Sequence, residues 1–393
     1  LTVHEPNLGN RVRVCNRALV LIDAYVYAGS DRGSGMALEP IRVLEFADAD
    51  RADVQRRVVD AVQAAPERFL TDYAARPGTF GGRYVCADAM KELLPEYTAS
   101  REARGRYNAP VHNAAAVLAA EQYRRVVADS SDPARNLVLF VTGMPGAGKT
   151  SEIQYAALHE GNRLGRDVRA IFEGQLVDPQ ASIAKVEQAL SAGCRVGVIA
   201  VLPRPEEALA HTFQRFEELG RGASAAVMVR IQEGTPDGLE ALLGRFGDQI
   251  SVAVHDVRDR ANVHRLEGMD GVNIWRKELE NGPVQERLER EFDRLNQLGR
   301  VSADCALQFK GQSPHGQLYA IGGPDVGGSL AHGDGRKATP ESGRTSLLNA
   351  ARGSSLAGLS DALKTGQSES DGKTKSNEIG HGLPKPPSPR RSR

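Results

Sequence analysis

An eight-residue segment, Gly-Met-Pro-Gly-Ala-Gly-Lys-Thr at positions 143–150, restricts the fold of this 393-residue chain more than any other feature. An apolar run, Leu137–Val141, precedes it, and residues at helical spacing follow it from Lys149 to Arg163. A strand, a glycine-rich loop and a helix in this order are the context of a phosphate-binding loop. A glycine-rich turn before an unrelated helix is the alternative, and the combination of the strand with Lys149 and Thr150 disfavours it.

The chemistry of such a loop follows from its backbone. Glycines let the chain turn tightly with its N–H groups directed inward, and the helix that follows adds the positive end of its dipole. We expect Lys149 to reach the β- and γ-phosphates of a nucleotide and the Thr150 hydroxyl to bind Mg²⁺. The residues expected to bind the nucleotide are Gly143, Met144, Pro145, Gly146, Ala147, Gly148, Lys149, Thr150 and Ser151.

Composition excludes several classes of protein. Lys plus Arg and Asp plus Glu both total 50, so no overall charge attracts nucleic acid. The four cysteines lie far apart in sequence and form no paired metal or redox motif, which favours a reduced, cytoplasmic setting. No apolar run approaches the ~20 residues of a membrane helix, and the first residues do not resemble a signal peptide. We therefore expect a cytoplasmic protein that contacts neither membrane nor nucleic acid.

Apolar strands alternate with amphipathic helices along most of the chain. The expected strands are 18–22, 41–46, 84–86, 137–141, 168–172, 196–202, 250–256 and 272–275. The expected helices are 50–64, 67–75, a short one between 88 and 95, 111–128, 149–163, 179–192, 205–219, one from 224, 236–246 and 283–298. This alternation predicts an α/β fold in which a parallel sheet is flanked by helices on both faces.

Three regions differ in composition. Residues 1–78 read as an N-terminal α+β extension without evident chemistry, and residues 79–310 contain the phosphate loop and its sheet. Residues 311–393 are rich in Gly, Ser, Asp and Pro, and we expect this low-complexity tail to be largely disordered. Its basic tip could bind nucleic acid, but a solvated tail is the favoured interpretation.

Other polar residues are ambiguous on spacing alone. Asp88 stands at a predicted helix start, where aspartate is a common N-cap. Asp256 ends an apolar strand and is a minor Mg²⁺ candidate, whereas His211 and His255 lack the spacing of metal ligands. No Asn-Lys-x-Asp motif is present, which argues against a GTPase.

From the phosphate loop to about Asp256 the chain resembles the zeta toxin family, P-loop kinases of toxin–antitoxin systems that phosphorylate UDP-N-acetylglucosamine with ATP. The shared features, in order, are Gly143–Thr150, Phe172–Gln175, Gly193–Val196, Arg215 and Gly220–Gly222. The resemblance implies a three-layer P-loop kinase domain that uses ATP and Mg²⁺, UDP-N-acetylglucosamine as acceptor, and an antitoxin protein as partner.

One feature departs from the family. Its aspartate strand normally follows the phosphate-loop helix, but residues 151–172 are too few to hold an extra strand and helix. A similar segment lies upstream, where a short strand is followed by Asp88, by Lys91 three residues later and by Pro95 four further on. We expect a rearranged order in which this upstream strand occupies the same place in the sheet, so that Asp88 and Lys149 reach one cavity.

The resemblance also implies roles for single residues. Asp88 is expected to accept the proton of the attacking hydroxyl, and Lys149 to neutralise the phosphates. The expected substrate-binding residues are Lys91, Glu173, Arg215 and Arg221, each of which would otherwise be a solvated surface charge. Two alternatives remain open: a P-loop kinase for another nucleotide or a dinucleotide, and a non-catalytic ATP-binding interaction module.

Overall fold

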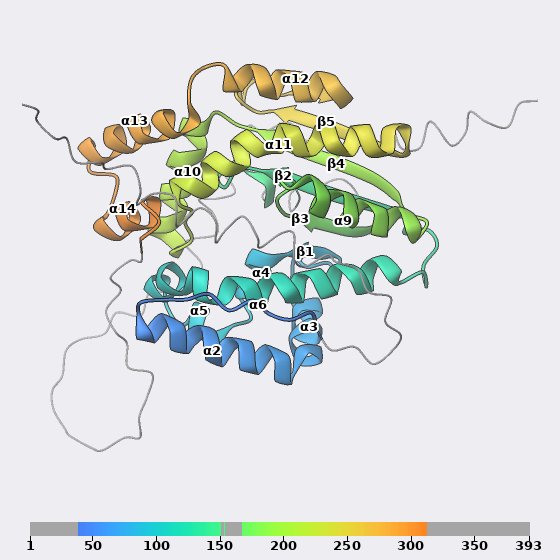
Figure 1. Cartoon of the computed structure of the whole chain (residues 1–393), viewed down its shortest axis with the longest axis horizontal. Helices are drawn as coiled ribbons and strands as arrows, with labels where there is room; N and C mark the ends of the chain where they lie inside the picture. Colours follow the sequence, from blue (N-terminus) through green and yellow to red (C-terminus); the bar gives the residue numbers. More distant parts are fainter. Residues whose placement is uncertain (1–37, 151–152, 154–166, 313–393) are drawn as a thin grey trace, which may run out of the picture.

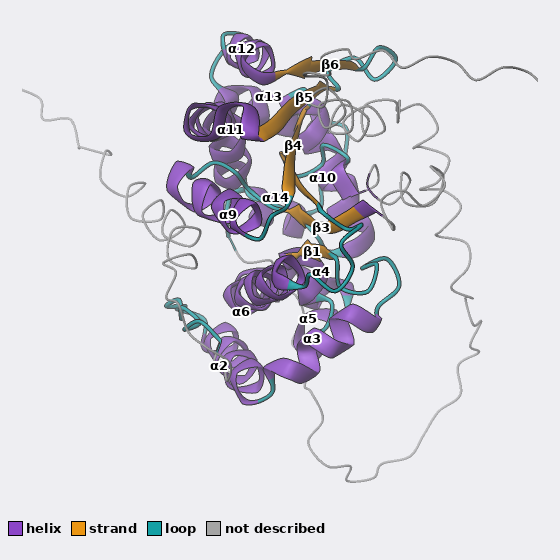
Figure 2. Cartoon of the chain, turned by 90° about the vertical axis from the view of Figure 1, so that its right-hand side faces the viewer, coloured by secondary structure: helices purple, strands orange, loops and turns teal. Residues whose placement is uncertain are grey.

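The computed structural model describes residues 38–150, 153 and 167–312, in which six strands form one sheet of order β1-β3-β2-β4-β5-β6. The strands are β1 (Tyr84–Cys86), β2 (Leu137–Gly143), β3 (Val168–Glu173), β4 (Arg195–Leu202), β5 (Ile250–Asp256) and β6 (His264–Glu267). All neighbours pair in parallel except β5 and β6, and helices lie on both faces of the sheet (Figure 2). The predicted α/β fold is confirmed, with an antiparallel strand added at one edge.

The upstream strand joins this sheet at its other edge. β1 pairs in parallel with β3, and Cys86 lies opposite Glu173. β3 in turn pairs with β2, whose last residue is Gly143 at the start of the glycine-rich loop. Because the carboxyl ends of parallel strands meet at one edge, Asp88 and the loop are brought to the same side of the sheet.

The helices agree with most of the sequence expectations. They are α2 (Ala49–Ala64), α3 (Pro66–Ala75), α4 (Ala87–Lys91), α5 (Pro95–Thr98), α6 (Arg101–Ala128), α9 (Pro179–Ser191), α10 (Pro205–Leu219), α11 (Ala225–Phe246), α12 (Gly268–Leu279), α13 (Val284–Gln297) and α14 (Ala303–Phe309), with a 3₁₀ turn at Gly247–Gln249. The strand expected at 18–22 and the tail from 313 lie outside the described residues, as does most of the helix expected at 149–163.

Four local expectations are wrong. Residues 41–46 are extended but form no strand, because side chains bond their backbone: Gln55 bonds both the N–H and the carbonyl of Leu44. Residues 272–275 are helical within α12 rather than a strand. The helix expected from Val111 begins ten residues earlier, at Arg101, with the Ser100 side chain as its N-cap. β6, α5 and α14 were not expected.

The fourth error concerns Pro236, which was expected to begin a separate helix and instead lies inside α11. Proline has no N–H, so the carbonyl of Gln232, four residues earlier, loses its helical donor. The indole N–H of Trp275 on α12 donates to that carbonyl at 2.8 Å. A tertiary contact therefore compensates the proline and keeps the helix continuous.

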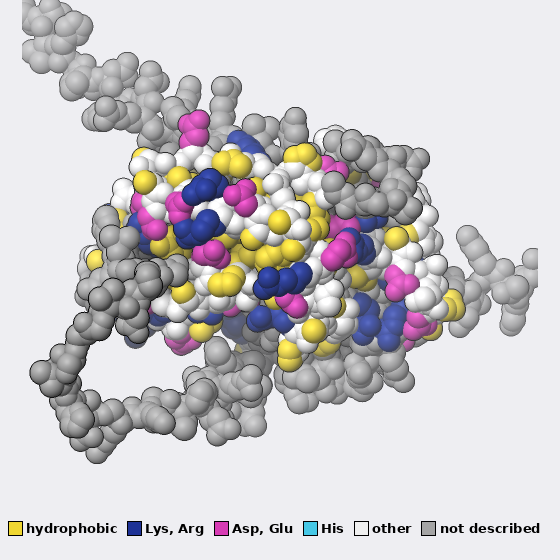
Figure 3. All heavy atoms as spheres, turned by 90° about the horizontal axis from the view of Figure 1, so that it is seen from below, with side chains coloured by type: hydrophobic (Ala, Val, Ile, Leu, Met, Phe, Trp, Pro, Cys, Tyr) yellow, Lys and Arg dark blue, Asp and Glu magenta, His cyan; other side chains and the backbone are white. Residues whose placement is uncertain are grey.

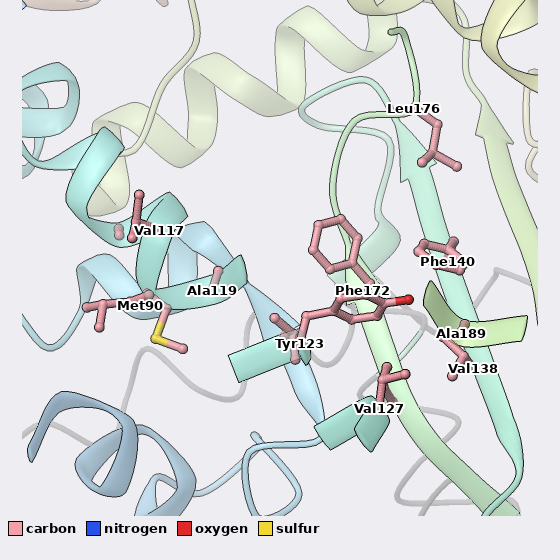
Figure 4. Packing of buried hydrophobic residues seen from close by; sticks show 14 of the residues in the cluster. Met90, Val117, Ala119, Tyr123, Val127, Val138, Phe140, Phe172, Leu176 and Ala189 are labelled. Carbon is pink, nitrogen blue, oxygen red and sulfur yellow. The ribbon is translucent and has the colours of Figure 1, made fainter. Parts of the chain in front are cut away.

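The N-terminal helices share a core with the sheet. Figure 1 shows α6 lying between α2 and the sheet, and Val54, Val58 and Tyr73 belong to the same apolar cluster as Phe140 and Phe172. The Tyr123 ring on α6 packs against the Phe172 ring on β3, with centroids 5.3 Å apart (Figure 4). This packing holds one face of α6 against the carboxyl edge of the sheet.

The α3 helix also fixes β1 directly. The Tyr73 hydroxyl donates to the carbonyl of Tyr84 at 2.7 Å and accepts from the N–H of Cys86 at 3.2 Å. Tyr73 is fully buried. Residues of the N-terminal region therefore position the strand that leads into Asp88.

The surface carries charges of both signs. On the face seen from below in Figure 3, Lys and Arg side chains are interspersed with Asp and Glu side chains. None of the helices in the described part of the chain is long and apolar enough to cross a membrane.

A buried ion-pair network joins α10, β5, α12 and α13. The Glu278 carboxylate, 4% exposed, accepts from Arg258 at 2.6 Å and from Arg287 at 2.8 Å. Arg287 also binds Glu206, and Arg258 also binds Asp256. Each guanidinium is thus shared between two carboxylates.

Replacing Glu278 with Ala is expected to lower the free energy of unfolding by about 3 kcal/mol, the lower end of the range for breaking a buried pair, because both arginines keep one partner. Urea denaturation of the variant measures this change. The control Glu187→Ala breaks the exposed pair with Arg245 and is expected to change stability by less than about 1 kcal/mol. Equal losses in the two variants would contradict the buried-network interpretation.

Candidate active site

The loop that follows β2 needs glycine at two positions. Gly143 has φ of +138° and Gly146 has φ of +82°. A Cβ on Gly143 would lie 2.6 Å from the carbonyl oxygen of Val201 on β4, and a Cβ on Gly146 would overlap the carbonyl oxygen of Ala208 on α10. Close approach of neighbouring backbone therefore requires glycine at both positions of the loop.

Replacing Gly146 with Ala is expected to weaken ATP binding and to lower the free energy of unfolding by about 1–3 kcal/mol, because the backbone is left-handed and the added methyl group meets a rigid carbonyl. Calorimetric titration with ATP and thermal unfolding measure the two effects. The matched control Gly244→Ala adds its methyl group to open space on α11. It is expected to stabilise the protein by about 0.5–1 kcal/mol, so a stabilised Gly146→Ala variant would contradict the prediction.

Lys149 folds back over the loop. Its ammonium donates to the carbonyl oxygens of Gly143 at 2.8 Å and Met144 at 2.9 Å. Burial lowers the pKa of Lys149 below its ordinary value of 10.5. The Lys149 ammonium is thus held by carbonyls of the loop that is expected to bind phosphate groups.

Thr150 faces a carboxylate. Its hydroxyl donates to Glu173 on β3 at 2.9 Å, and the Tyr84 hydroxyl on β1 donates to the same carboxylate oxygen at 2.6 Å. A hydroxyl beside a carboxylate is a set of hard oxygen ligands of the kind that Mg²⁺ prefers. The donors present therefore fit the predicted magnesium site at Thr150, with Glu173 as a further oxygen ligand.

Asp88 lies at the centre of a positive cluster. Its carboxylate accepts from Lys91 at 2.9 Å, from Arg221 at 3.2 Å and from Arg215 at 3.5 Å. The nearby charge of Lys91, reinforced by both arginines, holds the pKa of Asp88 well below its ordinary value of 3.8. The lowered pKa favours the ionised carboxylate, and the stability that ionisation gives the folded protein is lost as the pH falls through the lowered pKa.

Two segments distant in sequence build this cluster. Asp88 and Lys91 lie on α4 directly after β1, Arg215 lies on α10, and Arg221 follows the end of α10. Gly220 makes the turn with φ of +71°, and its Cα packs so closely against the carbonyl of Arg101 on α6 that a Cβ would overlap it. This close approach places the loop that carries Arg221 next to Asp88.

One cavity of about 190 Å³ connects these groups. Asp88, Lys149, Glu173 and Arg215 all line it, as do Gly143 and Pro145 of the loop. The structure thus brings Asp88 and Lys149 to one cavity, as expected from the rearranged order. Lys91 and Arg221 reach it through Asp88, and Lys91 is buried with a second bond to Asn108 at 2.7 Å. Ser151 lies outside the described residues.

The sequence analysis missed one lining residue, His112 on α6. It shares a helix face with Ala116, Ala119 and Ala120, which also line the cavity. A single imidazole on an alanine-rich helical face was the available signal.

The remaining candidates lie elsewhere. Asp256 lines a separate cleft of about 730 Å³ and is bonded to Arg258 at 2.6 Å, so it is not placed at the phosphate loop. His211 contacts the carbonyl of Gly146 and the guanidinium of Arg260, each at 3.2 Å. His255 is buried in β5. Within the described ranges, no cluster of three or more His, Cys, Asp or Glu residues could hold a metal ion.

Comparison with known proteins adds one structural likeness. No protein-family model and no curated protein matches the chain. A solved chain from the PezAT chromosomal toxin–antitoxin system of the human pathogen Streptococcus pneumoniae is similar at 13% identity and a TM-score of 0.33, covering 65% of this chain and 98% of that one. At this level the likeness carries no argument about activity or partners.

Proposed function

We propose that this protein is an ATP-dependent small-molecule kinase that transfers the γ-phosphoryl group of ATP to a hydroxyl of UDP-N-acetylglucosamine. The observation that carries the proposal is the shared cavity, in which the Asp88 carboxylate faces the same space as the Lys149 ammonium and the glycine-rich loop. A base, a glycine-rich loop with its lysine, and an arginine in one cavity are parts that phosphoryl transfer requires.

Each residue then has a role that its position supports. The N–H groups of the loop and Lys149 hold the β- and γ-phosphates, and Asp88 orients the acceptor hydroxyl and takes its proton. Arg215 and Arg221 bind Asp88 at 3.5 and 3.2 Å, and their planar forks are suited to phosphate oxygens. Thr150 and Glu173 would hold Mg²⁺, which when bound neutralises charge on the phosphates.

The predicted substrate-binding roles are kept, and Glu173 gains a second role. One part of the proposal is that Glu173 contacts the acceptor sugar. The other is that it helps Thr150 to hold Mg²⁺, since its carboxylate accepts from the hydroxyls of Thr150 and Tyr84. Lys91 is proposed to act on the substrate by holding Asp88, since it is buried and bonded to that carboxylate. Residues 79–310 are the proposed kinase domain.

The acceptor and biological role rest on the family resemblance of the motifs. By that resemblance the protein is the toxin of a toxin–antitoxin system, and an antitoxin protein is its partner. A cavity of about 190 Å³ is smaller than the ~300 Å³ at the lower end of small-molecule sites. It would enclose the reacting sugar, with the rest of the sugar nucleotide lying outside.

The direct test incubates the full chain with ATP, Mg²⁺ and UDP-N-acetylglucosamine and follows the products by phosphorus NMR. The expected result is a new phosphate monoester on the sugar, formed together with an equal amount of ADP. ATP binding without transfer to this acceptor or to a panel of nucleotides and dinucleotides would favour a non-catalytic ATP-binding module. Transfer to another member of the panel would identify a different P-loop kinase.

A further inference from the structure

His112 is a polar group without an evident structural role. Its imidazole lines the cavity, and it has no hydrogen-bond partner among the described residues. The residue is partly buried, and its ring nitrogens are open to the cavity rather than sealed within the protein. An imidazole that is open to a cavity beside the candidate base is placed to hydrogen-bond a ligand there.

The charge state of His112 indicates which chemical class of ligand it can bind. Burial, reinforced by the positive charges of Lys91 and Arg230, lowers its pKa to about 3, with Asp88 opposing the shift. At neutral pH the ring is therefore uncharged, with one nitrogen that donates and one that accepts. An uncharged imidazole attracts an anionic ligand only weakly, and the cations around Asp88 bind an anion more strongly. It matches a hydroxyl group, which also donates and accepts.

The surroundings leave room for such a ligand. Ala116, Ala119 and Ala120 follow His112 on one face of α6, and all three line the cavity. Phe172, within β3, and Gln175, just after it, also line the cavity. The Gln175 side chain is held by Arg230 of α11. The Lys185 ammonium also lines the cavity and lies 5.2 Å from the centre of the Phe172 ring. Small side chains beside polar groups suit the hydroxyl groups of a sugar ring.

We propose that His112 selects the acceptor by hydrogen-bonding a second hydroxyl group next to the one that faces Asp88. This inference rests on the proposed kinase function and adds to it a residue that distinguishes polyhydroxylated acceptors, such as a sugar ring, from acceptors with one hydroxyl. An acceptor with a single hydroxyl, such as a serine side chain, would leave the imidazole unpaired.

Two variants separate the hydrogen bond from the space that the ring fills. His112→Leu removes both polar atoms at similar size, whereas His112→Gln keeps a donor and an acceptor. With UDP-N-acetylglucosamine, His112→Leu is expected to lower kcat/KM by about 10- to 100-fold, and His112→Gln is expected to recover most of that loss. KM for ATP is expected to stay within about twofold in both, since His112 is not part of the loop. Equal losses in both variants, an unchanged His112→Leu enzyme, or a changed KM for ATP would each overturn the proposal.

A measurement on the unaltered protein separates this inference from the proposed function. The NMR signal of the His112 ring is followed during titration with N-acetylglucosamine and, as the single-hydroxyl probe, with 2-propanol. The sugar is expected to shift the signal and the alcohol is not. A shift with the sugar supports the binding role even if no phosphoryl transfer occurs, in which case the kinase proposal alone fails. Transfer by the wild-type protein without any shift overturns the role of His112 and leaves the kinase proposal standing.

Discussion

Replacing Asp88 with Asn is expected to lower kcat for phosphoryl transfer by about 10²- to 10⁴-fold, the usual contribution of a positioned general base. The amide keeps the shape of the side chain but cannot take a proton from the acceptor. ATP binding is expected to be unchanged or tighter, because Lys91, Arg215 and Arg221 lose the carboxylate that they share in the structure. Single-turnover transfer assays and calorimetric titration with ATP measure the two effects separately.

The matched control for this variant is Asp248→Asn. Asp248 is exposed in the short turn between α11 and β5 and does not line the cavity. This substitution makes the same chemical change and is expected to leave both kcat and ATP affinity within about twofold of the wild type, as for surface substitutions generally. An Asp88→Asn protein that transfers at the wild-type rate would remove the proposed base and with it the main support for a kinase.

Replacing Lys149 with Ala is expected to weaken ATP binding by about 10- to 100-fold and to lower kcat by a further ~10²- to 10³-fold. The first effect follows from the loss of charge-assisted bonds to the phosphates. The second follows because Lys149 is expected to stabilise the charge that develops on the transferred group. Calorimetric titration and the transfer assay measure the two effects.

The control for Lys149 is Lys277→Ala, which removes an exposed lysine from the last turn of α12. It is expected to leave ATP affinity within about twofold. Lys149 also donates to the carbonyls of Gly143 and Met144, so its loss could loosen the loop without involving a nucleotide. The thermal midpoint without ATP tests this: if stability falls while ATP affinity is kept, Lys149 is a structural residue of the loop.

The two substitutions also distinguish the broad interpretations. A kinase requires Asp88 for transfer and Lys149 for both binding and transfer. A non-catalytic ATP-binding module requires Lys149 alone, and its biological effect would survive Asp88→Asn. The pair therefore decides between an enzyme and an interaction module whatever the acceptor proves to be.

Local sequence determined the parts of this fold whose stabilising contacts are close in the chain. The glycines of residues 143–148, the cap at Asp178 with Pro179 after it, and the unbroken apolar runs of β4 and β5 each specify local backbone by steric or hydrophobic rules. The upstream position of the Asp88 strand was also predictable, because residues 151–172 are too few for another strand and helix.

Only the tertiary structure decided the features whose partners are far apart in sequence. Pro236 remains within α11 because the indole of Trp275 supplies a donor from another helix. Asp88 meets Arg215 and Arg221 because Gly220 lets one loop press against α6, and His112 lies in the cavity because Tyr123 packs α6 onto β3. Periodicity and caps report only on neighbours a few residues away, whereas a buried hydrogen bond or a shared cavity depends on the packing of whole elements.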